Sequence, residues 1–195
     1  MGKVYFYFST MNGQKSAHAI MKIFSFRQQN KECLVFKPKS DTRDGAYIKS
    51  RALNTKIPAT MVGEDEKNKM YDLVRGLKCS YVFIDEVQFF SKEKIEELVR
   101  IADELDINIF CYGLLTDFRG VLFEGSKRLI ECADSIREIV NSCPLCEKKA
   151  TRNMRLLGGV PTFEGEVIQI GYEESYKAVC RKCFNQFKKI HGGAA

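Results

Sequence analysis

Residues 81–86 read Tyr81-Val82-Phe83-Ile84-Asp85-Glu86, four apolar residues that end abruptly in two carboxylates. The apolar run predicts a strand buried on both faces, as in a parallel sheet. Ligands of open α/β sheets bind beyond the carboxyl ends of such strands. Because carboxylates buried without partners are costly, Asp85 and Glu86 suggest metal coordination or proton transfer. The alternative is a solvated strand end that happens to be acidic.

Strands and helices are expected to alternate on both sides of this segment. Further strands are predicted at 4–8, 33–36, 107–112 and 136–140, and helices from Lys15, at 70–77, at 95–105 and at 126–133. The first helix is expected to bury Ile20, Ile23 and Phe24, and Ser91 is a candidate N-cap for the third. The polar segment 38–58 is predicted to be a long loop. This alternation predicts a doubly wound parallel sheet that ends near residue 140.

Composition places the chain among globular proteins with one sizeable core and a small appendage. It has 195 residues, of which 45% are hydrophobic, and a formal charge of +6. Without a membrane-length apolar run or a leader-like start, we expect a cytoplasmic protein with no membrane contact. Much of the basic excess lies after residue 147, where a solvated basic face explains it. We therefore expect no nucleic-acid partner.

Eight cysteines divide into two groups. Four are isolated in or beside apolar segments and are interpreted as small buried hydrophobic residues. The other four form two C-x2-C pairs, Cys143 with Cys146 and Cys180 with Cys183. Two such pairs supply the four thiolates of a closed, structural Zn²⁺ site, which would provide much of the folding energy of a small lobe. Two disulfides or a redox motif are the alternative.

The first predicted strand runs into Ser9-Thr10-Met11-Asn12-Gly13-Gln14-Lys15-Ser16, and a helix follows. The Walker A pattern G-x-x-x-x-G-K-[ST] has this position, length and ending, but Ser9 and Gln14 replace its glycines. Backbone N–H groups at a helix N-terminus favour phosphate, Lys15 suits the β- and γ-phosphates, and Ser16 suits Mg²⁺. An ordinary strand–turn–helix corner is the alternative. A left-handed Gln14 would cost about 1–2 kcal/mol, so we expect weakened ATP binding.

Together these segments resemble the type II thymidine kinases over residues 3–185. The resemblance rests on S-T-M-N-G-Q-K-S, D-T-R at 41–43, F-I-D-E-V-Q-F-F, Y-G-L-L-T-D-F-R-G-V-L-F and the two cysteine pairs. It implies a RecA-like P-loop α/β core with helices flanking a parallel sheet, plus a zinc-binding lasso domain. It also implies a homotetramer that transfers the γ-phosphoryl group of ATP, with Mg²⁺, to the 5′-hydroxyl of thymidine. The expected boundaries are 1–140 for the core, 141–191 for the lasso domain and 192–195 for a disordered tail.

The resemblance also implies roles for individual residues. Glu86 matches the general base, Asp85 the carboxylate that holds Mg²⁺ through water, and Arg43 the D-T-R arginine. The ATP and Mg²⁺ site would consist of residues 9–16 with Asp85 and Gln88. The thymidine site would consist of Phe89, Leu114, Phe118, Phe123, Asn153, Ile170, Gly171 and Tyr176. Tyr172 replaces the family's second glycine in Gln169-Ile170-Gly171-Tyr172.

Two alternatives to an active thymidine kinase stay open at this point. One is a catalytically impaired nucleotide-binding relative, suggested by Ser9 and Gln14. The other is a nucleic-acid-dependent ATPase with a zinc lobe, suggested by the basic C-terminal part and by Asp85-Glu86-Val87-Gln88. Helicases with such a box generally need a second RecA-like domain, for which this chain is too short.

Overall fold

A computed structural model describes residues 1–165 and 174–191. Its larger part is a six-stranded parallel sheet in the order β5-β2-β6-β7-β1-β8. The strands are β1 (Val4–Ser9), β2 (Cys33–Pro38), β5 (Thr60–Val62), β6 (Tyr81–Ile84), β7 (Asn108–Leu114) and β8 (Ser135–Glu138). The α/β fold predicted from the alternation of elements is confirmed.

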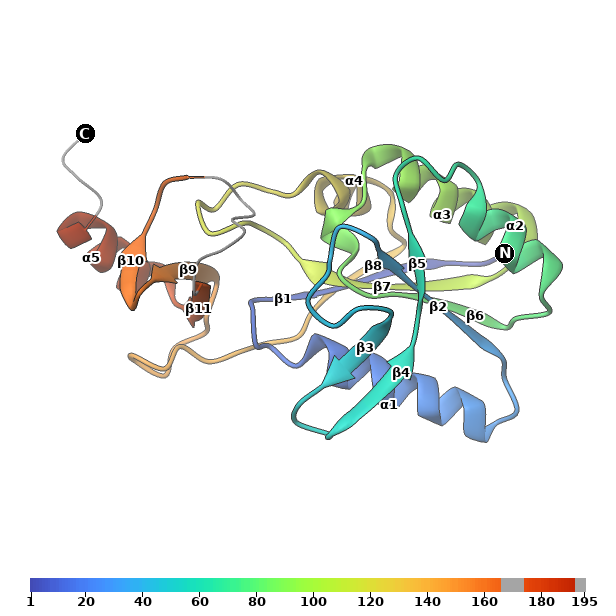
Figure 1. The fold of residues 1–195 in the computed structure, drawn as a ribbon, viewed down its shortest axis with the longest axis horizontal. Helices are drawn as coiled ribbons and strands as arrows, with labels where there is room; N and C mark the ends of the chain where they lie inside the picture. The colour runs from blue at the N-terminus through green and yellow to red at the C-terminus, as the bar shows by residue number, and fades with distance from the viewer. Residues whose placement is uncertain (166–173, 192–195) are drawn as a thin grey trace.

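Helices cover both faces of this sheet (Figure 1). Helix α1 (Lys15–Gln28) lies on one face, and α2 (Lys69–Gly76), α3 (Lys92–Leu105) and α4 (Glu124–Cys132) lie on the other. Two apolar cores follow from this arrangement, one around α1 and one beneath α2, α3 and α4. The predicted cap of α3 is present, since the Ser91 hydroxyl accepts from the backbone N–H of Lys94.

The prediction of a loop over 38–58 was wrong. A hairpin of β3 (Tyr47–Ser50) and β4 (Thr55–Pro58) forms there, and β5 begins two residues later. Ile48 and Ile57 are 1% exposed and join the core around α1. Each strand buries a single isoleucine against the core around α1, and most of its other residues are polar. The sequence pattern was therefore too polar to predict strands.

Two further expectations need correction. Phe24 does not belong to the buried face of α1, since it is 46% exposed. The helices expected from the sequence also omit α5 (Arg181–His191), which begins between Cys180 and Cys183. Its apolar contacts are the adjacent Cys183 and Phe184 with Phe187, too short a stripe to stand out in the sequence.

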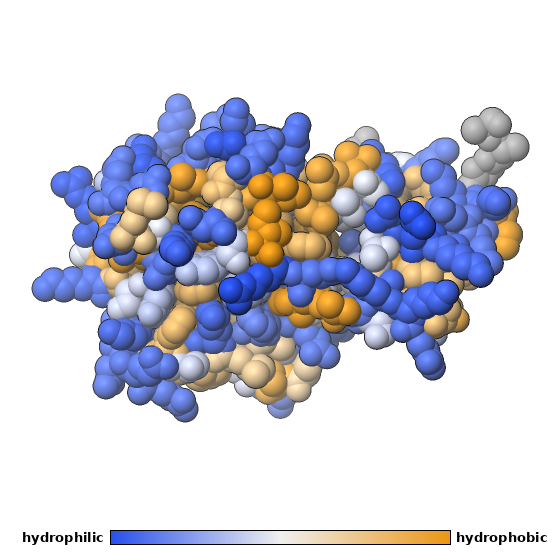
Figure 2. Space-filling view, turned by 180° about the vertical axis from the view of Figure 1, so that it is seen from behind, coloured by the Kyte–Doolittle hydropathy of each residue, from blue (hydrophilic) through white to orange (hydrophobic). Residues whose placement is uncertain are grey.

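The C-terminal part forms a separate small lobe beside the sheet (Figure 1). It contains an antiparallel sheet in the order β10-β9-β11, formed by β9 (Arg152–Leu157), β10 (Val160–Thr162) and β11 (Glu174–Val179). Its own apolar cluster includes Met154, Phe163 and Phe184. Seen from behind, the molecule carries apolar side chains near its middle, between the two parts (Figure 2). No helix among residues 1–165 and 174–191 has the length and apolar character needed to cross a membrane.

Candidate active site

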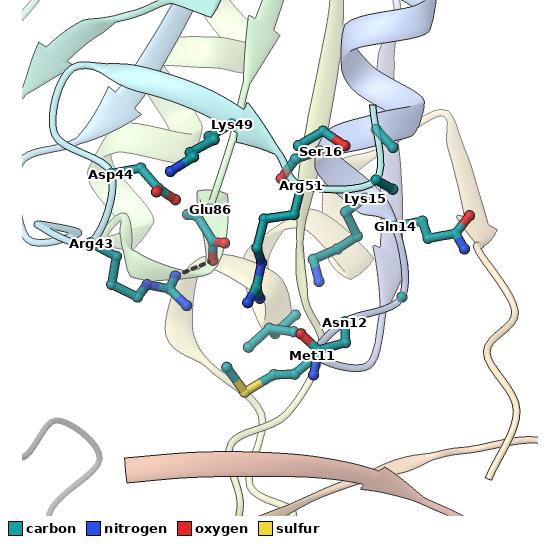
Figure 3. Close-up of a pocket in the computed structure, with 15 residues that line it drawn as sticks. Met11, Asn12, Gln14, Lys15, Ser16, Arg43, Asp44, Lys49, Arg51 and Glu86 are labelled. Atoms are coloured by element: carbon teal, nitrogen blue, oxygen red, sulfur yellow. Dashed lines mark ion pairs between the residues drawn. The ribbon is translucent and has the colours of Figure 1, made fainter. Parts of the chain in front are cut away.

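A cavity of about 610 Å³ opens at the carboxyl ends of β1 and β6. The loop between β1 and α1 forms one side of it, and the β3–β4 hairpin with the segment before it forms another (Figure 3). Glu86 and Leu114 contribute from the ends of β6 and β7. The lining residues are Met11, Asn12, Gly13, Gln14, Lys15, Ser16, Ala17, Arg43, Asp44, Lys49, Ser50, Arg51, Ala52, Glu86 and Leu114. The basic side chains among them suit a polyanion.

The loop after β1 has the backbone of an anion cradle. Asn12 and Gln14 take left-handed conformations, with φ of 58° and 60°, and Gln14 precedes the first residue of α1. Gly13 is needed for space, since a Cβ there would lie 1.8 Å from Ser9 Oγ. The Ser9 hydroxyl fills this space and donates to the Ile139 carbonyl at 2.6 Å. Ser9 is therefore accommodated, whereas Gln14 adopts a conformation that favours glycine.

Lys15 and Ser16 begin α1 at the cavity. The Lys15 ammonium is buried and donates to the Thr10 carbonyl at 3.2 Å. Burial lowers the pKa of Lys15, although the carboxylates of Glu86 and Asp85 oppose this effect. The Ser16 hydroxyl donates to Asp85 Oδ2 at 3.4 Å. The start of α1 thus places an ammonium and a hydroxyl at the cavity, with the hydroxyl in contact with Asp85.

Asp85 and Glu86 are adjacent in sequence but lie in different environments. Asp85 is 3% exposed, and its Oδ1 has no hydrogen-bond partner among the described residues. Burial, followed by the charge of Glu86, raises the pKa of Asp85 to about 7. An orphaned carboxylate oxygen beside the Ser16 hydroxyl fits a hard cation such as Mg²⁺. Glu86 lines the cavity and has a left-handed φ of 53°, a strained conformation common at functional sites.

The Glu86 carboxylate is held by two donors. Arg43 Nη2 lies 3.0 Å from Glu86 Oε2 (Figure 3). Gln88 Nε2 donates to the same oxygen at 2.5 Å. Gln88 is itself fixed, because its Oε1 accepts from the backbone N–H of Leu114 at 3.0 Å. Arg43 Nε lies 2.8 Å from Asp41 Oδ1. The arginine therefore bridges two carboxylates from different parts of the chain.

The aromatic residues expected around the base are not among the residues that line the cavity. Phe89 and Phe123 meet edge to face with ring centroids 5.7 Å apart. Phe118 is buried, and the Arg155 guanidinium lies 3.8 Å from its ring centroid. Tyr176 is half-buried on β11, in register with Arg155. Leu114 lines the cavity, and Ile170 and Gly171 lie outside the described residues.

Asn153 joins the small lobe to the phosphate loop. Its Oδ1 accepts from the backbone N–H of Met11 at 2.8 Å, and its Nδ2 donates to the Thr116 carbonyl at 3.2 Å. Asn141 adds a second link, donating to Thr10 Oγ1 at 3.1 Å and to the Met11 carbonyl at 3.3 Å. The side-chain amides of Asn153 and Asn141 thus help to fix the backbone of the cradle.

The two cysteine pairs converge in the small lobe. The sulfur atoms of Cys143, Cys146, Cys180 and Cys183 all lie within 4.8 Å of one another. A tetrahedral ion with Zn–S bonds of about 2.3 Å needs sulfur–sulfur separations of about 3.8 Å, so the cluster fits Zn²⁺. The site is closed by four protein thiolates and is therefore structural in character.

The sequence did not point to several residues of the site. Lys37, Lys49, Arg51 and Asn141 were missed, and the first three lie in or beside the segment predicted to be a loop. Alternating Tyr47-Ile48-Lys49-Ser50 was the available signal for a strand with one face toward the cavity. Asn141 carried no signal of its own.

Comparisons with known proteins agree along nearly the whole chain. The sequence profile of the family described as "Thymidine kinase" matches residues 2–184. A thymidine kinase of Lactococcus lactis subsp. lactis (strain IL1403) is 39% identical over 184 residues, covering 93% of this chain and 96% of that protein. One of Enterococcus faecalis (strain ATCC 700802 / V583) is 36% identical over 193 residues, covering 98% of each. One of Streptococcus pyogenes serotype M3 (strain MGAS315) is 37% identical over 182 residues, covering 93% and 96%.

Proposed function

The chain belongs to the thymidine kinase family, and from that premise we propose that its cavity transfers the γ-phosphoryl group of ATP to the 5′-hydroxyl of thymidine. One observation supports this proposal for the residues of this chain. The Glu86 carboxylate and the anion cradle of residues 11–16 face the same cavity. An alcohol beside Glu86 and a triphosphate on the cradle can therefore meet in line.

We assign the phosphate site to the cradle and to the residues that begin α1. The backbone N–H groups of 12–16 and the Lys15 ammonium would bind the β- and γ-phosphates. Asp85 and Ser16 would hold Mg²⁺, which neutralises charge on the phosphates when bound. Lys49 and Arg51 add positive charge from the hairpin. This division leaves Glu86 for the nucleoside.

We assign the proton transfer to Glu86. As the 5′-oxygen bonds to the γ-phosphorus and the bond to the β-γ bridging oxygen breaks, the hydroxyl proton passes to the Glu86 carboxylate and ADP leaves. Arg43, whose Nη2 lies 3.0 Å from Glu86 Oε2, would stabilise charge on the transferring group. Gln88 orients the carboxylate through its hydrogen bond.

We propose that the thymine ring lies between Leu114 and the small lobe. Phe89, Phe118 and Phe123 would form apolar surroundings for the base, and Asn153 would fix the phosphate loop. By resemblance, the edge of the base would meet Ile170, Gly171 and Tyr176. The four cysteines would hold Zn²⁺ to stabilise the lobe that carries these groups.

Product formation tests the function directly. The protein with ATP and Mg²⁺ should form ADP and a nucleoside monophosphate with thymidine, measured by mass spectrometry across a panel of deoxynucleosides. Absence of thymidine-dependent ADP in zinc-loaded protein would favour an impaired nucleotide-binding relative. Stimulation of ATP turnover by DNA, without any effect of thymidine, would favour a nucleic-acid-dependent ATPase.

We also propose how the chain is organised and assembled. β8, the last strand of the six-stranded sheet, ends at Glu138, and the part that follows has its own apolar cluster. Both observations support a P-loop domain at 1–140 and a zinc lobe at 141–191. Exposed apolar residues such as Val121, Leu122 and Val140 suit the subunit contacts of a homotetramer, which light scattering would show as the mass of four chains. The eight cysteines form no disulfides, which suits the reducing cytoplasm, and cell fractionation would test this location.

A further inference from the structure

A buried ion pair lies beneath the cavity, at the end of β2. Lys37 Nζ is 2.9 Å from Asp41 Oδ2, and the two side chains are only 2% and 3% exposed. Removing two charges from water is so costly that a well-packed apolar pair is often equally or more stabilising. Stability alone therefore does not account for this pair, and its contacts must be considered.

Asp41 connects the buried pair to the active site through its contacts with Arg43. Its Oδ1 accepts from Arg43 Nε at 2.8 Å and from the Arg43 backbone N–H at 3.4 Å. Burial on its own would raise the pKa of Asp41, but hydrogen bonds and charges from Arg43 and Lys37 outweigh it and lower that pKa. Asp41 is thus kept as an ionised acceptor whose second oxygen is available to the arginine.

Arg43 depends on this acceptor for its position. Its side chain is 49% exposed, so packing restrains it little, and its ion-pair partners among the described residues are Asp41 and Glu86. Without Lys37, the Asp41 charge would be balanced by Arg43 alone. We expect Arg43 then to be drawn toward Asp41 and away from the Glu86 carboxylate.

Lys37 also joins two parts of the cavity wall. Its ammonium donates to the carbonyls of Gly45 and Tyr47, each at 3.4 Å, in addition to Asp41. All three donor positions of the ammonium therefore have acceptors. These bonds secure the segment that carries Arg43 between β2 and the first residue of β3.

We propose that Lys37 is a positioning residue for phosphoryl transfer, which acts by holding Asp41 and thereby Arg43 against Glu86. This inference rests on the proposed function and adds to it a residue that lines no part of the cavity. The charge of Lys37 also acts on Asp85, whose pKa it lowers against the larger effect of burial. An effect through Arg43 must therefore be separated by experiment from an effect through Asp85.

A double-mutant cycle separates them. We expect Lys37→Met to lower kcat about tenfold and Arg43→Ala to lower it about 10²-fold. If Lys37 acts through Arg43, the double variant should match Arg43→Ala within about twofold. Multiplied losses, or a loss that appears only as weaker Mg²⁺ activation, would overturn the proposal by placing Lys37 on another route.

Two controls keep a folding defect from deciding the result. Lys94→Met removes a similar buried lysine, paired with Glu97 at 3.2 Å on α3, and should cost stability while kcat stays within twofold. Lys37→Met with Asp41→Leu removes both buried charges together, so Tm should approach that of the parent. That pair should still lower kcat at least about tenfold, and should cause no further loss in the Arg43→Ala background.

The remaining outcomes are also decisive. If the doubly apolar variant retains kcat within twofold of the parent, Lys37 has a structural role only and the proposal is wrong. If kcat of Lys94→Met falls as far as that of Lys37→Met, the loss is a general effect of buried charge and the proposal is likewise wrong. A parent protein without thymidine-dependent ADP formation would overturn the proposed function, and this inference with it.

Discussion

At the scale of the residue, Gln14 replaces the second glycine of the Walker A pattern, and its backbone is left-handed. Its φ of 60° costs a residue with a side chain about 1–2 kcal/mol, part of which glycine would lose again through its greater freedom in the unfolded chain. Gly13 does not relieve this strain, because Gln14 itself keeps the left-handed conformation.

We expect Gln14→Gly to bind ATP about two- to tenfold more tightly, measured by calorimetric titration. Gln14→Ala is the matched variant, because it removes the side chain from the cavity but keeps the left-handed strain. If only Gly tightens binding, strain is responsible, and if both do, crowding is. Equal dissociation constants for all three proteins would show that Gln14 has no effect on the nucleotide.

Glu86 is the residue to which we assign the proton transfer. Glu86→Gln keeps the size of the side chain and an acceptor for Arg43 but cannot take the hydroxyl proton. We expect kcat to fall by about 10² or more while the dissociation constant for ATP changes little. Glu104→Gln, on α3 and outside the cavity, is the control. An unchanged rate in Glu86→Gln would require a different base.

Asp85 gives the metal-free protein a pH-dependent stability. Its pKa is raised from 3.8 to about 7, so the folded protein keeps a proton that the unfolded chain has lost. The stabilisation is complete below about pH 4 and is lost as the pH rises through about 7. We expect Asp85→Asn to raise the free energy of unfolding by about 1 kcal/mol or more at pH 8 and by less at pH 4. Denaturant unfolding at both pH values checks this, and parallel pH profiles for parent and variant would contradict it.

At the scale of the element, the C-terminal lobe has a small core that includes three of the four clustered cysteines. Cys143, Cys180 and Cys183 are themselves part of its apolar cluster, and the lobe's sheet has only three short strands. Loss of one thiolate should therefore release the lobe while the six-stranded sheet survives.

We expect Cys183→Ser to lose bound zinc and to become sensitive to limited proteolysis after about residue 140, with the core fragment left intact. Cys79→Ser, which alters a half-buried cysteine of the core, should keep the cutting pattern of the parent. An identical pattern in Cys183→Ser and the parent would show that the lobe folds without a complete metal site.

At the scale of the whole molecule, the lobe and the core meet at the phosphate loop. Asn153 is 4% exposed and satisfies the Met11 N–H and the Thr116 carbonyl together. Removing its amide leaves two backbone groups without partners, at a cost of about 1–3 kcal/mol. The cradle backbone would lose the restraint that the lobe imposes on it.

We therefore expect Asn153→Ala to raise KM for ATP several-fold, although Asn153 belongs to the lobe. Asn108→Ala is the control, because Asn108 bonds the backbone of Lys3 at the opposite end of β7. Steady-state kinetics with ATP and thymidine varied in turn checks the prediction. A rise confined to KM for thymidine would show that the lobe acts on the base alone.

The sequence by itself determined those features that depend on patterns within a few neighbouring residues. The apolar run before Asp85, the loop before Lys15 and the two C-x2-C pairs each carry a signal within a few residues, because strand burial, helix starts and metal turns are short-range. From these the α/β fold, the cradle and the zinc cluster followed.

Only the tertiary structure decided the rest. Ile48 and Ile57 make the hairpin a strand pair because α1 supplies the surface that buries them. Lys37 and Arg43 acquire their roles from Asp41 and Glu86, and Glu86 lies 43 residues beyond Arg43 in the chain. Asn153 reaches Met11 across 142 residues. Such contacts leave no periodic trace in the sequence, since the energy that fixes them arises only when distant segments pack together.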